Sequence, residues 1–343
     1  SKLGAQLGSS SPLLNQIWQF PFAWPLPIPD ELNAVDKDSF KKLVKESSMD
    51  ASYIVTIEDE GSKIDINDLN SPSKALREVT KTQLMNIFTQ KMKEDEKFGR
   101  QHANTRFDEL INSIADWMSD KATSANGGDK RAAYSTLNQE AQGEYYPPNR
   151  SFRSLAELHF VPGMTDEFYD ILASRVTIYG MKGINPNIAS KDVLKSLDPG
   201  MTDEVIKEIV KRRDDQNEGG PFKDKKEFWD FVTLKGARLE GKTDDIPLTF
   251  DSVFNFKIRA TGEFAGATRE ITAIVMDLNK TVSKVKDYVG QEKKETEGKG
   301  DEAVDPNDPT KKTGDAGSKD KEKQQQQTPI SKGPPRIVYW NER

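Results

Sequence analysis

The chain has 343 residues, 34% of them hydrophobic, which is enough to build modest cores in two or more domains. Its 50 Lys and Arg against 56 Asp and Glu give a formal net charge of −6, which disfavours binding to nucleic acid. The absence of cysteine excludes disulfides, thiolate catalysis and cysteine-ligated zinc. No apolar stretch approaches the roughly 18–20 residues that cross a bilayer, and we expect any signal or anchor to precede Ser1.

The first predicted strand is Ser52–Glu58, a β-branched and aromatic segment with three apolar side chains on one face. An acidic turn at Asp59-Glu60-Gly61 follows, and Lys63–Asn67 then alternates again. We therefore expect these two segments to form a β-hairpin.

A helical block is predicted from Ser73 to about Leu234. Apolar residues recur there at intervals of three and four, as in Leu110, Ile111, Ile114 and Trp117, with polar breaks between such runs. This period is that of helices with one buried face.

The last part of the chain returns to strands. Alternation over Phe254–Ile258 and Ile271–Val275, with Gly262 and Gly266 between them, predicts a second hairpin. The charged segment 291–332 has few large apolar residues, and we expect it to be disordered. Arg336–Trp340 alternates again and carries two aromatic residues that are costly to expose, so it is predicted to return to the sheet.

This order of elements predicts an α+β fold in which a helical domain is inserted into a sheet. Residues 1–70 and 241–343 form the two parts of the sheet domain, and residues 71–240 form the inserted all-α domain.

A repeat lies inside the helical block, as Val161-Pro-Gly-Met-Thr-Asp-Glu167 and Asp198-Pro-Gly-Met-Thr-Asp-Glu204. Pro-Gly makes a turn, and Thr165 and Thr202 are expected to cap the next helix. Such helical hairpins are similar to helix-hairpin-helix units that bind DNA phosphates. Here carboxylates stand where a phosphate would lie, which favours packing over DNA binding; these are Asp166, Glu167, Asp203 and Glu204.

Oxygen-bearing side chains are concentrated where the helix containing Asp116 ends. The predicted metal ligands are Asp116, Asp120, Asp129 and Glu144, around the glycine pair of Asn126-Gly-Gly-Asp129. Calcium takes six to eight such oxygens, so it is the ion we expect, although the spacing is not that of an EF-hand. A solvated acidic loop that ends a helix is the alternative.

No enzymatic motif is present. The chain lacks a nucleophile elbow, a phosphate-binding loop and a dinucleotide-binding fingerprint. His102 and His159 are too far apart in sequence for a histidine metal site of their own. We therefore expect a protein without catalytic activity and without a certain cofactor; a hydrolase with dispersed carboxylates stays open as an alternative.

Several of these stretches, taken in order, resemble the K-type minor pseudopilins of type II secretion systems. The matching stretches are Ile57–Asn67, Ile114-Ala-Asp-Trp117, Gly127-Gly128 with Tyr134, Phe152–Leu158 before Val161-Pro-Gly, and Ile184–Ala189 before the second Pro-Gly-Met-Thr. The chain departs from that family at Gly128-Asp129-Lys130, where a Gly-Ala-Glu-Asp run is typical, and in its long charged segment.

The resemblance implies a pseudopilin α/β fold, with an N-terminal helix on an antiparallel sheet and a large helical insertion. It implies a tip subunit that starts pseudopilus assembly with the I- and J-type minor pseudopilins and supports export across the outer membrane. The place implied is the periplasm of a Gram-negative bacterium, with an inner-membrane anchor. An apolar helix remnant is expected either to contact these partners or to pack on its own sheet, through Leu13, Leu14, Ile17 and Trp18. A helix-hairpin-helix DNA-binding protein is the alternative function.

Overall fold

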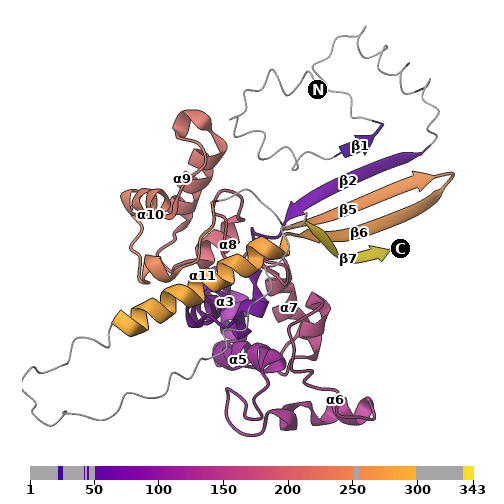
Figure 1. The fold of residues 1–343 in the computed structure, drawn as a ribbon, viewed down its shortest axis with the longest axis vertical. Helices are drawn as coiled ribbons and strands as arrows, with labels where there is room; N and C mark the ends of the chain where they lie inside the picture. The colour runs from indigo at the N-terminus through magenta and orange to yellow at the C-terminus, as the bar shows by residue number, and fades with distance from the viewer. Residues whose placement is uncertain (1–21, 26–41, 43–44, 46–50, 251–254, 299–334) are drawn as a thin grey trace, which may run out of the picture.

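The computed structural model describes residues 22–25, 42, 45, 51–250, 255–298 and 335–343. They form an α+β fold, as predicted, in which a helical body gathers around one end of an antiparallel sheet (Figure 1). The sheet order is β1–β2–β5–β6–β7. These strands are β1 (Phe22–Trp24), β2 (Ser52–Asp59), β5 (Asn255–Phe264), β6 (Ala267–Met276) and β7 (Arg336–Glu342).

The predicted hairpin between Ser52–Glu58 and Lys63–Asn67 is wrong. Strand β2 pairs with β1 and β5, whereas β3 (Ile64–Asp65) pairs in parallel with β4 (Val176–Thr177) in a separate sheet. The reason is burial: Ile64 is 1% exposed within the core of the helical body. Packing in that core outweighs the local alternation on which the hairpin was predicted.

The second hairpin and the returning strand are confirmed. Strands β5 and β6 pair in register, and their turn at Ala265-Gly266 has positive φ at both residues (50° and 80°), as tight hairpin turns require. Gly262 lies within β5 and not in the turn. Strand β7 pairs with β6, but its aromatic residues are not buried as expected.

The helical block predicted between Ser73 and Leu234 is also confirmed. Its helices are α3 (Lys74–Glu94), α4 (Glu96–Gln101), α5 (Phe107–Met118), α6 (Ser135–Glu140), α7 (Asp166–Ala173), α8 (Lys191–Ser196), α9 (Asp203–Asp214) and α10 (Lys225–Leu234). Short 3-10 helices lie between them, namely η2 (Ile66–Asn70), η3 (Lys130–Tyr134), η4 (Leu155–Phe160), η5 (Gln216–Glu218) and η6 (Thr243–Asp245). The predicted division at residues 70/71 and 240/241 stays a prediction.

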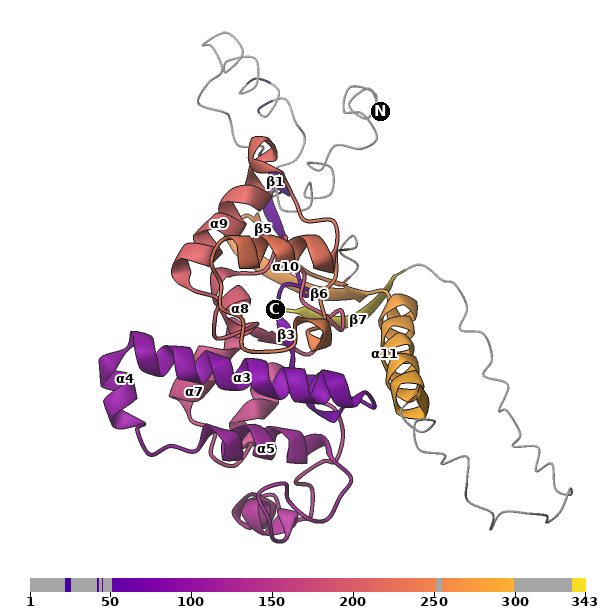
Figure 2. The same cartoon turned by 90° about the vertical axis from the view of Figure 1, so that its left-hand side faces the viewer.

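Helix α3 runs through the middle of the body, beside α5, α7 and α8 (Figure 2). Phe88 on α3 is fully buried; its ring stacks on Phe107 with centroids 4.4 Å apart and meets the edge of Phe168 at 5.7 Å. These contacts join three helices into one core, and fully buried aromatic side chains of this kind dominate core energetics.

A helix that was not predicted, α11 (Leu278–Gly298), follows β6 and lies beside the start of α3 (Figure 1). It includes the first residues of segment 291–332; residues 299–332 lie outside the described part. The Glu292 carboxylate accepts hydrogen bonds from Ser73 Oγ at 2.6 Å and from the backbone N–H groups of Lys74 and Ala75 at 3.1 and 2.8 Å. It thus caps α3, and this contact ties α11 to the body.

Buried polar contacts fix the near end of the sheet to the body. Asn255, at the start of β5, donates from Nδ2 to the carbonyl oxygens of Tyr179 and Gly180, at 2.9 and 3.1 Å. Next to it, Lys182 Nζ lies 2.6 Å from Asp65 and 2.8 Å from Asp68, and all three side chains are largely buried. The sheet and the body are therefore joined by satisfied polar groups and not by apolar packing alone.

Candidate functional site

One face of the sheet is apolar across its middle, with charged residues only at the ends of its rows, namely Asp59, Arg269 and Glu342. Cross-strand pairing places the same-face residues of neighbouring strands in rows, since directly paired residues point to the same side. The rows are Phe22–Val55–Ala260–Ile271, Ile57–Ile258–Ala273–Trp340 and Phe256–Val275–Ile337. We call these residues, together with Trp24 and Tyr53, the apolar sheet face.

The apolar sheet face is most exposed at its two edge strands. On the edge strand β7, Ile337 is 60% and Trp340 is 55% exposed. On the other edge strand, β1, Phe22 is 48% exposed. Large apolar side chains left open together mark surfaces that bind other proteins, and exposed edge strands offer unpaired backbone groups besides. This face is the strongest candidate for a contact surface on the described residues.

The four residues predicted to contact neighbouring subunits, Leu13, Leu14, Ile17 and Trp18, lie outside the described residues. Their role stays a prediction. The described chain begins at β1, the edge strand to which that segment leads.

The four predicted metal ligands do not converge. Asp116 accepts hydrogen bonds from Ser124 Oγ at 2.6 Å and from the Ala125 N–H at 3.1 Å. Asp129 caps η3, Glu144 pairs with Arg131 at 2.9 Å, and Asp120 is exposed. In the part of the chain that the structure describes, no three His, Asp or Glu side chains gather into a metal site. This arrangement does not fit a shared ion, and calcium binding stays a prediction.

The side chain of a lysine lies in the interior of that loop. Lys130 is 3% exposed, and its Nζ donates to the Ser119 carbonyl and to Asn149 Oδ1, both at 2.6 Å. Lys130 was not predicted from the sequence as a functional residue. The feature of the sequence that could have indicated Lys130 is its place in Gly128-Asp129-Lys130, where the chain departs from the Gly-Ala-Glu-Asp run of the family.

The repeated helical hairpins pack inside the body. As predicted, Thr165 and Thr202 cap α7 and α9, accepting from the N–H groups of Phe168 and Val205. In the second copy the buried Asp198 accepts from the N–H groups of Gly200, Glu240 and Gly241 at 2.8–3.1 Å. Backbone N–H groups of this chain therefore hold the Asp198 carboxylate, as they would hold a bound anion.

The two histidines lie beside the first copy of the repeat. His102 Nε2 is 3.0 Å from Glu167, and His159 Nδ1 is 3.3 Å from Asp166. Both carboxylates stand in the first turn of α7, where negative charge is favourable. A phosphate approaching this turn would meet like charge.

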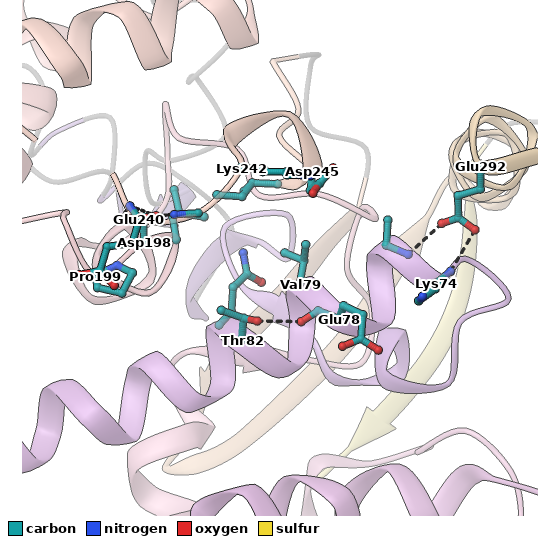
Figure 3. A pocket seen from close by; sticks show the side chains of 15 residues that line it. Lys74, Glu78, Val79, Thr82, Asp198, Pro199, Glu240, Lys242, Asp245 and Glu292 are labelled. Atoms are coloured by element: carbon teal, nitrogen blue, oxygen red, sulfur yellow. Dashed lines mark hydrogen bonds between the residues drawn. The ribbon is translucent and has the colours of Figure 1, made fainter. Parts of the chain in front are cut away.

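An open cavity of about 710 Å³ lies between α3, the second hairpin turn and α11 (Figure 3). Its charged lining residues are Lys74, Glu78, Asp198, Glu240, Lys242, Asp245 and Glu292. Figure 3 shows Glu292 reaching from α11 to the start of α3, so that two of the walls are held together by that cap. The lining contains lysines and carboxylates but neither histidine.

None of the helices in the described part of the chain is both long enough and apolar enough to cross a membrane.

Comparisons with known proteins agree on a relationship. Two family models described as type II secretion system protein K match residues 62–181 and 184–247, and together they cover more than half of the chain. One chain of the crystal structure of the GspK-GspI-GspJ complex from the type 2 secretion system of enterotoxigenic Escherichia coli has a similar fold, with a TM-score of 0.51 and 16% identity. The similarity covers 68% of this chain and 78% of that one. A search of curated protein sequences gives no match.

The matched family models and the α+β fold, in which a helical body interrupts an antiparallel sheet, define a component of a type II secretion system. The chain belongs to the protein K family, the K-type minor pseudopilins. The order of motifs in the sequence predicted this family, and that prediction is confirmed.

Proposed function

We propose that this chain forms the tip of the type II secretion pseudopilus. In this role it starts assembly with the I- and J-type minor pseudopilins and so supports protein export across the outer membrane. The observation that carries the proposal is the contrast between the closed core of the helical body and the open apolar sheet face beside it.

The shape of the molecule supports a tip position. The body gathers at one end of the sheet (Figure 1). Subunits that contact the apolar sheet face would therefore lie alongside the sheet, while the body would block the addition of subunits at the end that it occupies. Exposed edge strands and large apolar side chains supply the contact with the I- and J-type subunits.

Its work is assembly without catalysis. The sequence carries no nucleophile or cofactor motif. An inner-membrane anchor that precedes the sequence would hold the chain on the periplasmic side, where the filament is built. The acidic first turns of α7 and α9 disfavour the alternative of DNA binding.

Light scattering tests the assembly part of the proposal. The chain is mixed with the soluble domains of the I- and J-type minor pseudopilins from the same organism, with duplex DNA as a separate arm. We expect a stable complex with the partner domains and none with DNA. A complex with DNA and none with the partners would instead support the helical-hairpin alternative.

Matched variants locate the contact. The double substitution Ile337→Ser and Trp340→Ser should weaken the complex at least tenfold, because central aromatic anchors carry most interface energy. The control is Leu234→Ser, at the end of α10, where the side chain is 80% exposed; helix α10 lies away from the strands of the sheet (Figure 1). Equal weakening by both would show that the contact is not at the sheet face. Leu13→Ser with Ile17→Ser tests the predicted helix contact in the same way.

Labelling tests the tip position. Because the chain has no cysteine, Leu234→Cys provides a single site for a thiol-reactive gold particle on assembled pseudopili. One particle at one end of each filament is expected. Particles spaced along the filament would contradict a tip position.

A further inference from the structure

The loop between α5 and η3 has a positive charge built into its interior. It leaves α5 at Ser119, turns back through Gly127 and Gly128, which have φ of 92° and 79°, and reaches Lys130. A short antiparallel bridge between Thr123 and Asp129 closes it. Lys130 then points inward and is 3% exposed.

The Lys130 ammonium joins segments that are distant in sequence. Its Nζ binds the Ser119 carbonyl, at the end of α5, and Asn149 Oδ1, which belongs to the segment after α6; both distances are 2.6 Å. The backbone N–H of Lys130 donates to the Ala122 carbonyl at 3.0 Å. One side chain thus fixes the start of the loop, its end and the segment that covers it.

Two nearby carboxylates stabilise the Lys130 charge, although the pKa of Lys130 is lowered overall. Burial lowers the pKa of Lys130, and the nearby carboxylates of Asp116 and Asp120 act in the opposite direction by stabilising its charge. Asp116 is held in place by Ser124 and Ala125 and so cannot swing away without breaking those hydrogen bonds.

These groups are of the types that bind calcium. A backbone carbonyl, an asparagine amide oxygen and carboxylates are its usual ligands, and six to eight oxygens are needed at 2.3–2.6 Å. An ammonium needs only a few acceptors, and two are in place at hydrogen-bond distance. A divalent ion brought beside the buried ammonium would be repelled by like charge.

We propose that the Lys130 ammonium takes the place of a divalent cation in this loop, so that the loop is ordered without calcium. The loop and the helices that it joins then fold independently of calcium in their surroundings. This inference concerns folding and does not depend on the proposed tip position.

Thermal unfolding of the full chain, in chelator and in millimolar calcium, tests the proposal. The wild type should unfold at the same temperature in both conditions. Lys130→Met should lower the midpoint by roughly 5–10 °C in chelator, because two hydrogen-bond acceptors and two nearby carboxylates lose their cation. Lys130→Asp should have a low midpoint in chelator and regain several degrees with calcium, since it adds a carboxylate to the existing oxygens.

The matched control is Lys121→Asp, which makes the same charge change at an exposed position of the same loop. It should unfold like the wild type in both conditions. Where Lys130→Asp does not fold, Lys130→Met titrated with calcium replaces it, because it keeps the same oxygen ligands.

Three results would overturn the proposal. The first is stabilisation of the wild type by calcium. The second is a wild-type midpoint for Lys130→Met in chelator. The third is the absence of any calcium response in the Lys130 variants, which would mean that these oxygens do not form a cation site.

Discussion

The helical body and the sheet differ in how far their apolar residues are buried. In the body, Phe88, Ile111 and Trp117 are at most 1% exposed. In the sheet, Ile337 and Trp340 are more than half exposed although they lie on an apolar face. The body therefore carries its own stability, whereas the sheet exposes apolar surface that a contact with another protein would cover.

The junction between the two regions resembles the body, because its side chains are buried and have partners. Asn255 and the two aspartates that Lys182 binds are buried and hydrogen-bonded, and the Lys182 side chain is only 14% exposed. The sheet is thus held firmly at one end and open along its face. The comparison leads to predictions in which the same kind of substitution has a large effect in one region and a small effect in the other.

The largest difference is expected between two phenylalanines. Phe88→Ala should lower the free energy of unfolding by about 3–5 kcal/mol, because it leaves a cavity among the stacked rings of the body. Phe264→Ala, at the exposed tip of the β5–β6 hairpin, should lower it by less than about 0.5 kcal/mol. Urea unfolding measures both, and similar losses would contradict the contrast between the regions.

A slightly smaller effect is expected at the junction. Lys182→Met should cost about 3 kcal/mol, because it leaves Asp65 and Asp68 buried together without their cation. Lys226→Met, which removes an exposed partner of Asp230, is the control and should change stability little. If the two variants unfold alike, the buried ion cluster does not stabilise the junction.

A moderate, pH-dependent effect is expected where α11 meets the body. Burial raises the pKa of Glu292, but hydrogen bonds from Ser73, Ala75 and Lys74 outweigh it, so the pKa is lowered. The ionised carboxylate therefore stabilises the fold at neutral pH, and this contribution is lost as the pH falls through the lowered pKa. Glu292→Gln should lower the free energy of unfolding by about 1 kcal/mol at pH 7. It should have no effect at a pH where Glu292 is protonated in both the folded and the unfolded state. A cost that does not change with pH would contradict a role for the charge.

The smallest effect on the isolated chain is expected on the sheet face. Trp340→Ser should lower the free energy of unfolding by less than about 1 kcal/mol, since the side chain is already 55% exposed. The same substitution is expected to weaken partner binding strongly. A large loss of stability without any loss of binding would reverse the assignment of this face.

Sequence patterns correctly predicted the features that depend on neighbouring residues, such as turns and helix caps. The β5–β6 hairpin followed from alternation around a glycine turn, and the caps at Thr165 and Thr202 followed from turn residues placed before helices. The partner of Ile64 could not be predicted in this way, because its alternation fits a hairpin as well as the buried parallel pair with β4. Helix α11 was missed although Leu278, Val282, Val285 and Val289 recur at intervals of three and four; its last turns lie in the charged segment that was expected to be disordered.

The site depended still more on tertiary contacts. Lys130 becomes significant only once Ser119 and Asn149 lie around it, and no spacing in the sequence indicates that. The aromatic residues of β7 were correctly placed in the sheet, but the expectation that they are buried was wrong. Their exposure is the feature on which the proposed assembly role depends.

Hydrogen–deuterium exchange tests the central claim most directly, that the sheet face is completed by partner subunits. Exchange is compared for the chain alone and in the presence of the I- and J-type domains. The account predicts slower exchange in β1, β2 and β7 on complex formation, with exchange in α5 and α7 unchanged. Slower exchange confined to the helical body, with the sheet unaffected, would contradict it.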